Sequence, residues 1–249
     1  MINSVNKYKN YSKSEAELLN AGIKLRVFSA KDLKRILGWK RTKIHNTLSM
    51  LKKKNKAVNI KKNLYTLSSD ISENIFMIAV KAVEPAYISF WTACSYYNLT
   101  EQQLRAVQLV STKQYPEMQI DSFLIETITY KPERFYGYIT KDNFVIAEKE
   151  KLVVDMLFKP ERTGGMDETR KCLRNMWRDI EEKKLLNYLK RFNNRSIYAR
   201  LGYLSEELVL KNNIKKELQK NLPQSIVKLN PQKKKKKNTH KKWRIDIND

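Results

Sequence analysis

The feature that most constrains the fold is a glycine turn between two segments with helical apolar spacing. The first segment begins with a capping pattern at Ser29 and Asp32, and apolar residues recur three and four positions after Leu33. Gly38 ends this segment, because glycine adopts the left-handed conformation that closes many helices. A second apolar-sided segment starts two residues later, so the sequence predicts a helix-turn-helix.

Further elements surround this pair of helices. A Ser-x-x-Glu capping box at Ser12, or alternatively at Ser14, predicts an earlier helix. Residues 58–60 and 64–67 are β-prone runs on either side of a polar turn, and they predict a basic hairpin. These elements in this order are typical of a winged helix-turn-helix. Residues 1–70 are therefore predicted to form a DNA-binding domain of that kind.

The remaining residues, 71–249, are predicted to form a larger mixed α/β domain with a small sheet and a helical C-terminal half. Its expected strands are residues 106–111, 123–130, 136–139 and 144–147. Its expected helices are residues 72–83, 89–97, 148–158, 167–177, 181–192, 196–210 and 214–222. The fold class predicted for the whole chain is α+β.

Positive charge is concentrated at the two ends of the chain. The formal net charge is +24; residues 1–67 hold 17 Lys and Arg against 3 Asp and Glu, and residues 228–249 hold 9 against 2. The ends therefore carry +14 and +7, which leaves only +3 for the long middle. Because such an excess most often neutralises a polyanion, we expect nucleic acid to meet the ends of the chain.

The sequence indicates neither a membrane protein nor a disulfide-bonded one. No apolar run approaches the roughly 18 residues that span a bilayer, and no signal-peptide segment is recognisable. Cys94 and Cys172 lack disulfide or zinc spacing, so both are predicted to be reduced, partly buried thiols. The only two histidines, His45 and His240, are far apart in the sequence, so few ligands remain for a histidine-based metal site. We expect a cytoplasmic protein without a metal or other cofactor.

The third helix, from about residue 40, is predicted to meet DNA. Ile44, Leu48 and Leu51 share one face, and polar residues lie opposite them. Arginine can pair with guanine and asparagine with adenine, most often from the N-terminal part of such a helix. The predicted base-contacting residues are Arg41, Lys43 and Asn46, with Thr42 and His45 as weaker candidates. The predicted phosphate-binding residues are Lys40, Lys52, Lys53, Lys61 and Lys62. The alternative interpretation is an ordinary solvated helix face.

No recognisable catalytic centre is present in the sequence. Glu148, Glu150 and Asp155 lack a partner carboxylate at nuclease spacing, and we interpret them as charges on a helix surface. Gly164-Gly165 lacks the following lysine and helix start of a phosphate-binding loop. The chain is therefore predicted not to be an enzyme.

A lysine-rich segment, residues 233–242, lies near the C-terminus and contains the unbroken run Lys233–Lys237. The self-repulsion of this run opposes compact packing without an anion and predicts mobility. Residues 243–247 alternate large apolar and charged residues as an edge strand does, so a closed loop is the alternative to a free tail. A phosphate-binding appendage and a solubilising segment remain equal alternatives for its role.

Several segments of the larger domain, in order, resemble one known family. They are AYISFWTACSYYNLTEQ at residues 86–102, LVSTK from Leu109, FVIAEKEKLVVDML from Phe144, RLGYLSEEL from Arg200 and WRIDIN from Trp243. In this order they resemble the antitoxin and transcriptional regulator of AbiE abortive-infection systems, a type IV toxin-antitoxin family. That family places a winged helix before a mixed α/β domain.

The resemblance implies a repressor that binds an operator near its own promoter through the N-terminal domain. It also implies that the C-terminal domain counteracts a nucleotidyltransferase-like toxin, without a stable complex between the two proteins. The positions that match the most telling segment are Arg200, Leu201, Gly202, Tyr203 and Glu206. We interpret these residues as structural, with Gly202 allowing close helix packing and Arg200 forming an internal ion pair.

The sequence therefore predicts a two-domain, antitoxin-like transcriptional regulator that binds double-stranded DNA as a monomer or homodimer. One alternative is a plain repressor whose second domain senses a ligand or forms dimers. A nucleic-acid-processing enzyme with an accessory winged helix is another, and RNA binding by the same basic surface is a third.

Overall fold

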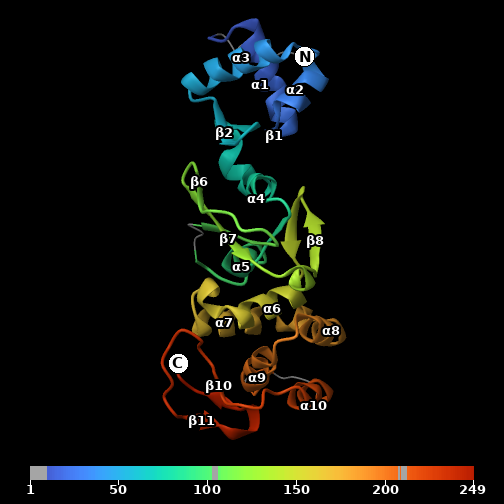
Figure 1. Cartoon of the computed structure of the whole chain (residues 1–249), viewed down its shortest axis with the longest axis vertical. Helices are drawn as coiled ribbons and strands as arrows, with labels where there is room; N and C mark the ends of the chain where they lie inside the picture. Colours follow the sequence, from blue (N-terminus) through green and yellow to red (C-terminus); the bar gives the residue numbers. More distant parts are fainter. Residues whose placement is uncertain (1–9, 103–105, 207, 209–211) are drawn as a thin grey trace. The chain divides into compact units, whose positions relative to one another are not determined.

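The computed structural model describes residues 10–102, 106–206, 208 and 212–249 as a mixed α+β protein (Figure 1). The chain divides into two compact units. The first contains the chain up to Glu84 together with Gln119–Phe123, and the second contains Pro85–Met118 and Leu124–Asp249. The boundary expected after residue 70 falls at the start of a helix that belongs to the first unit.

The first unit packs helices against a small antiparallel sheet of strand order β1-β3-β2. Its elements are α1 (Lys13–Leu25), β1 (Val27–Phe28), α2 (Ala30–Leu37), α3 (Arg41–Lys53), β2 (Ala57–Lys61), β3 (Leu64–Leu67), the 3₁₀ turn Ser68–Asp70 and α4 (Ile71–Ala82). Strands β2 and β3 form a hairpin whose turn contains Asn63 at φ 59°. The strand β1 was not expected from the sequence.

The helix ends of the first unit follow the capping residues. Ser12 caps α1 and exchanges hydrogen bonds with Glu15 at 2.8 and 3.2 Å, so the first of the two predicted starts is confirmed. Ser29 and Asp32 make the same reciprocal pair at α2. Gly38 ends α2 in the left-handed region with φ 67°, as predicted. These caps fix where α3 can begin.

The core of the first unit is apolar and centred on α1, α2 and α3. Ile44, Leu48 and Leu51 are at most 1% exposed, which confirms the apolar face expected for α3. Ile36 was expected in this core but is 46% exposed. The buried side of α2 is centred between Ala30 and Leu37, and Ile36 lies roughly a quarter turn away from it.

The second unit is built on most of a six-stranded mixed sheet of order β6-β7-β5-β4-β9-β8, in which only Gln119–Phe123 are assigned to the first unit. Its elements are β4 (Ala86–Ile88), α5 (Phe90–Tyr96), β5 (Ala106–Ser111), β6 (Met118–Ile120), β7 (Phe123–Thr129), β8 (Tyr138–Lys141) and β9 (Phe144–Ala147). The inner strand β4, which the sequence did not predict, pairs antiparallel with β5 and parallel with β9. It joins two halves of the sheet that lie far apart in sequence.

The helical half of the second unit follows the sheet and ends in a second small sheet. Its elements are α6 (Lys149–Phe158), α7 (Met166–Met176), α8 (Glu182–Phe192), α9 (Arg195–Leu204), α10 (Asn212–Lys220), β10 (Val227–Lys228), β11 (Thr239–His240) and β12 (Ile245–Asp246). The helix expected over residues 196–210 ends at Leu204, and residues 207 and 209–211 lie outside the described part of the chain.

The C-terminal strand β12 is the central strand of the second sheet, whose order is β10-β12-β11. The prediction of an edge strand was therefore wrong. The apolar and the charged residue of this strand are both buried. Ile245 is completely buried, and the buried carboxylate of Asp246 accepts hydrogen bonds from main-chain amides. Across the described ranges, no helix is long and apolar enough to cross a bilayer.

Candidate nucleic-acid interface

Helix α3 divides cleanly into a buried and an exposed face. Ile44, Leu48 and Leu51 are completely or almost completely buried in the core of the first unit. The predicted base-contacting residues occupy the rest of the helix surface: Arg41, Thr42, Lys43 and Asn46 are exposed, and His45 is half-buried. A helix with this division presents donors and acceptors to an outside partner without disturbing its own packing.

Two of these side chains are held at the N-terminal end of α3 by local contacts. The Nζ atom of Lys43 lies 3.9 Å from the centroid of the Trp39 ring, a cation–π geometry. The Nε atom of Arg41 donates a hydrogen bond to Nε2 of His45 at 3.2 Å. Both contacts are exposed or half-exposed, so a stronger external partner can replace them at small cost.

A basic hollow adjoins this end of the helix. Lys31, Lys34 and Arg41 line a cavity of about 260 Å³ together with Ala30 and Asn63. The Asn63 carboxamide oxygen accepts a hydrogen bond from the Ala30 amide at 3.3 Å, which fixes the hairpin turn beside the start of α2. Lys31 and Lys34 were not among the residues predicted from the sequence. The pattern that predicted the helix-turn-helix also places them on the exposed side of its first helix.

The predicted phosphate-binding lysines differ in their availability. Lys40, Lys52, Lys53 and Lys62 are exposed, and no hydrogen bond or ion pair engages their amines within the described chain. Lys61 is also exposed, but its Nζ donates to the carbonyl oxygen of Ala82 at 2.9 Å. The prediction for Lys61 did not anticipate this contact, which joins the hairpin to the end of α4.

Lys54 follows the helix and is committed to an internal partner. Its Nζ lies 2.7 Å from Oε1 of Glu15, which completes the capping box of α1 with Ser12. The hydrogen bond from Lys54, followed by that from the Ser12 amide, holds the pKa of Glu15 below its usual range. The pair ties the last turn of α3 to the first turn of α1, so this lysine serves the fold.

The acidic residues of α6 were predicted to lie on a helix surface, and that prediction was wrong. Asp155 is completely buried, Glu150 is 5% exposed and Glu148 is half-buried. Asp155 forms an ion pair with Lys151, one turn earlier on the same helix, and this lysine is also completely buried. The periodic pattern misled because a buried ion pair looks the same as a surface pair in sequence.

Aromatic side chains surround the buried lysine. The Nζ atom of Lys151 lies 5.0 to 5.6 Å from the ring centroids of Tyr87, Tyr130, Tyr136 and Phe192. Burial lowers the pKa of Lys151, and the charge of Asp155 opposes this shift. Asp155 in turn accepts hydrogen bonds from the Tyr87 hydroxyl at 3.2 Å and the Ser89 hydroxyl at 2.8 Å. Both carboxylate oxygens of Asp155 therefore have partners, and aromatic rings surround the ammonium of Lys151.

The other two carboxylates join α6 to α8. Lys184 Nζ lies 2.9 Å from Glu148 Oε1 and 3.3 Å from Glu150 Oε2, and the Tyr188 hydroxyl donates to Glu148. Burial alone would lower the pKa of Lys184, but the hydrogen bond to Glu148 and the charge of Glu150 raise it. Among the residues that the structure describes, no group of three His, Cys, Asp or Glu side chains is placed to hold a metal ion.

Both cysteines are free and buried rather than partly buried. A hydrogen bond with Cys172, together with burial, raises the pKa of the Cys94 thiol well above its usual value. Such a thiol stays protonated at neutral pH, whereas a nucleophilic cysteine needs a thiolate.

Arg200 is buried, but it does not form the internal ion pair that was expected. Its guanidinium donates to the carbonyl oxygens of Lys228, Leu229 and Leu157 at 2.8 to 3.2 Å. Burial lowers the pKa of Arg200 to about 10, and the charge of Glu161 partly offsets this shift. Three main-chain carbonyls thus accept the hydrogen bonds that were expected to go to one carboxylate. Through them Arg200, on α9, contacts α6 and the segment at β10.

The remaining matched residues, on α9 and just after it, also contact the C-terminal segment. Gly202 lies against Trp243 so closely that a Cβ atom would stand 2.1 Å from the ring. Glu206 accepts a hydrogen bond from the indole nitrogen of Trp243 at 2.6 Å, and Tyr203 makes an edge contact with His240. Leu201 is completely buried. The expected close approach at Gly202 is thus present, with an indole ring as the partner.

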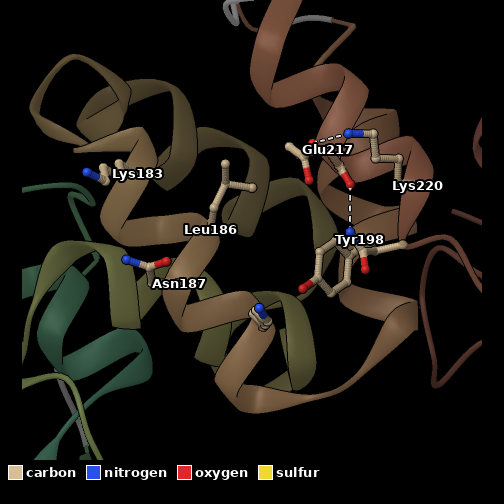
Figure 2. Close-up of a pocket in the computed structure, with 8 residues that line it drawn as sticks. Lys183, Leu186, Asn187, Tyr198, Glu217 and Lys220 are labelled. Carbon is tan, nitrogen blue, oxygen red and sulfur yellow. Dashed lines mark hydrogen bonds and ion pairs between the residues drawn. The ribbon is translucent and has the colours of Figure 1, made fainter.

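A polar cavity of about 540 Å³ lies between the helices of the second unit (Figure 2). Figure 2 shows Lys183, Leu186 and Asn187 on α8 opposite Glu217 and Lys220 on α10, with the Tyr198 ring of α9 between them. Lys220 pairs with Glu217 at 2.5 Å, whereas the amines of Lys183 and Lys190 meet no hydrogen-bond or ion-pair partner on the described residues. Burial, and then the charge of Glu217, raise the pKa of Tyr198. The cavity size suits a small ligand.

Comparison with known proteins gives a fold and no family. No family model and no curated protein matches the chain. The structure is similar to the crystal structure of the RV2827C protein from Mycobacterium tuberculosis, with a TM-score of 0.67 and 11% sequence identity. The similarity covers 94% of this chain and 91% of that one. At this level of identity it shows a shared mixed α+β fold over nearly the whole length.

Proposed function

We propose that this protein is a sequence-specific regulator of transcription that binds double-stranded DNA. In this proposal the protein acts in the cytoplasm and is not an enzyme. The first unit acts as a winged helix-turn-helix in which α3 enters the major groove. The hairpin of β2 and β3 serves as the wing and contacts phosphates beside the groove. This assignment follows from the order of capped helices, glycine turn and hairpin.

The exposed face of α3 is the observation that carries the proposal. Its N-terminal half offers Arg41, Lys43 and Asn46 to solvent, while its apolar face is fixed in the core. Paired hydrogen bonds from Arg to guanine or from Asn to adenine contribute about 1 to 3 kcal/mol of discrimination each. Lys31, Lys34 and Lys62 add positive charge around this face, which supplies affinity for phosphate without sequence preference.

Selection of bound duplexes from a random DNA pool tests this proposal. We expect a consensus sequence to emerge, and we expect the full-length protein to bind that duplex at least about 10³-fold more tightly than a random one. A flat pool at moderate ionic strength, with equal affinity for every duplex, would contradict the proposal. The Arg41→Ala and Asn46→Ala variants then assign the consensus positions to side chains.

The antitoxin role is a further part of the proposal. It is supported by the AbiE-like segments, two of which meet in the fold where Gly202 and Glu206 contact Trp243. A gene for a nucleotidyltransferase-like protein should lie next to the gene for this chain. Co-expression should restore growth in cells that this neighbour inhibits, without co-purification of the two proteins. Continued growth inhibition under full co-expression would contradict the antitoxin role and leave the role in transcription regulation as the remaining proposal.

The cavity between α8 and α10 favours a second candidate function, a repressor that senses a small ligand. The unpaired Lys183 and Lys190 give the cavity an excess of positive charge that suits an anionic ligand. Nucleoside triphosphates, simple phosphate and dicarboxylates can be screened by thermal unfolding. A ligand that raises the unfolding temperature and changes operator affinity, with both effects lost in Lys190→Gln, supports this function.

A further inference from the structure

The lysine run near the C-terminus forms a closed loop within the second unit. Lys233–Lys237, called the lysine loop below, connects β10 to β11 and is fully exposed. It lies between two strands that both pair with β12, so its two ends are fixed by the same small sheet. The closed-loop alternative considered from the sequence therefore describes it better than a free tail.

Two buried side chains hold the backbone of the lysine loop. The Asp246 carboxylate accepts hydrogen bonds from the amides of Lys236 and Asn238, each at 3.1 Å. The Asn248 carboxamide donates to the carbonyls of Lys233 and Lys234 at 3.1 and 3.2 Å. Asp246 and Asn248 are at most 1% exposed, and they contact the main chain rather than the lysine amines. The backbone of the lysine loop is thus held in one conformation by residues outside the loop.

The charge of the loop is mostly left uncompensated. Lys233 lies 3.5 Å from a carboxylate oxygen of Asp249, and the Lys236 amine donates to the main-chain oxygen of the same residue. The amines of Lys234, Lys235 and Lys237 have no hydrogen-bond or ion-pair partner within the described ranges. Lys237 has φ 58°, in the left-handed region that lysine rarely adopts. Like charges held close together repel, so this arrangement opposes folding unless an anion is bound.

We infer that the lysine loop is a preformed contact for the phosphate backbone of duplex DNA. The inference rests on the proposed function, which it extends from the first unit to the second. A run of lysines on an anchored backbone presents several ammonium groups together, and they release counterions when they neutralise phosphates. The loop itself consists only of lysines, and the large apolar residues that follow it, Trp243 and Ile245, are buried. No apolar side chain is therefore available there to insert into a bilayer. Phosphate contacts of this kind add affinity without sequence preference.

The test uses the full-length variant Lys234→Gln/Lys235→Gln/Lys237→Gln, which removes three charges and none of the anchoring contacts. A matched control, Lys113→Gln/Lys131→Gln/Lys216→Gln, removes three exposed charges elsewhere in the second unit. Affinity for a random-sequence duplex is measured from about 50 to 200 mM salt. The loop variant should bind more than about tenfold more weakly than the control, with a salt slope smaller by up to about 2.7.

The inference and the proposed function fail in different ways. If the loop is a DNA contact, the loop variant weakens selected and random duplexes by the same factor and keeps the preference between them. An unchanged salt slope, or equal loss in loop and control variants, overturns the inference and leaves the function of α3 untouched. Loss of binding to phosphatidylserine vesicles, with duplex binding intact, would overturn it in favour of a membrane. Absence of any sequence preference in the unmodified protein would instead overturn the proposed function.

Discussion

The two units place their charged side chains in opposite ways. In the first unit, α3 turns Arg41 and Lys43 to solvent and buries no charged residue. In the second unit, α6 is buried around most of its circumference and encloses Lys151 and Asp155 completely. The charges of α3 are available to a partner, whereas those of α6 have all their partners within the protein. Exposure, rather than residue type, separates charges that are free to meet a partner from those that stabilise the fold.

The largest effect should come from breaking the buried pair. Replacing Lys151→Met leaves the Asp155 carboxylate buried without its counter-charge, which should lower the free energy of unfolding by about 3 to 5 kcal/mol. Urea unfolding measures the change. The matched control is Lys149→Met on the same helix, which loses an ion pair with the exposed Asp179 and a cation–π contact with Tyr97 and should cost about 1 kcal/mol or less. Equal losses in the two variants would remove the distinction between the helices.

An exposed charge of α3 should behave in the reverse manner. Arg41→Ala should leave the unfolding temperature unchanged, because the side chain makes only one exposed hydrogen bond in the free protein. It should reduce the preference for the selected duplex over a random one by about 1 to 3 kcal/mol. Competition binding with both duplexes measures this. A drop in unfolding temperature with intact preference would assign Arg41 to the fold.

Lys62, at the turn of the hairpin, should affect affinity without affecting preference. Lys62→Ala should weaken binding to every duplex alike and reduce the salt slope by about 1. Lys61→Ala is the natural comparison, since the Lys61 amine is already bound to the Ala82 carbonyl and should change the slope less. Titrations at several salt concentrations decide between them. A larger slope change for Lys61 than for Lys62 would show that the internal contact yields to phosphate.

The smallest effect should be a pH-dependent one at the junction of α1 and α3. The folded-state pKa of Glu15 lies below its ordinary value of 4.5, so its ionised form stabilises the fold above that pH. This contribution should disappear as the pH falls through the lower, folded-state pKa. Glu15→Gln should therefore be less stable than the unmodified protein at neutral pH, by about 1 kcal/mol or less, and equally stable in acid. Urea unfolding at the two pH values measures it; a difference that persists in acid would assign the loss to packing.

Local signals in the sequence were sufficient for the elements around α3. Capping at Ser29 and the left-handed residue Gly38 depend on neighbours within one helical turn, so they can be identified without the fold. The short strands β1 and β4 were missed because two or three residues carry no periodic pattern. They exist only because partner strands distant in sequence pair with them.

Contacts between distant residues explain most of the other differences. The contact of Lys61 with Ala82 and the pair of Lys54 with Glu15 join residues 21 and 39 positions apart, beyond the reach of any local pattern. The same holds for Arg200, whose carbonyl partners come from segments 28 to 43 residues away. Exposure of the α3 face was predictable, because its apolar residues repeat at helical spacing. Burial of the α6 charges was not.

The stacking of Lys43 on Trp39 makes this lysine a side chain with two resting positions. In the free protein the amine rests on the indole, a contact that contributes about 0.5 to 1 kcal/mol at an exposed site. If α3 enters the groove as proposed, only a duplex that presents a good acceptor at that position draws the amine away. Other duplexes leave the amine on the ring. Under that proposal Trp39, which precedes α3, would set a threshold for the sequences that Lys43 accepts.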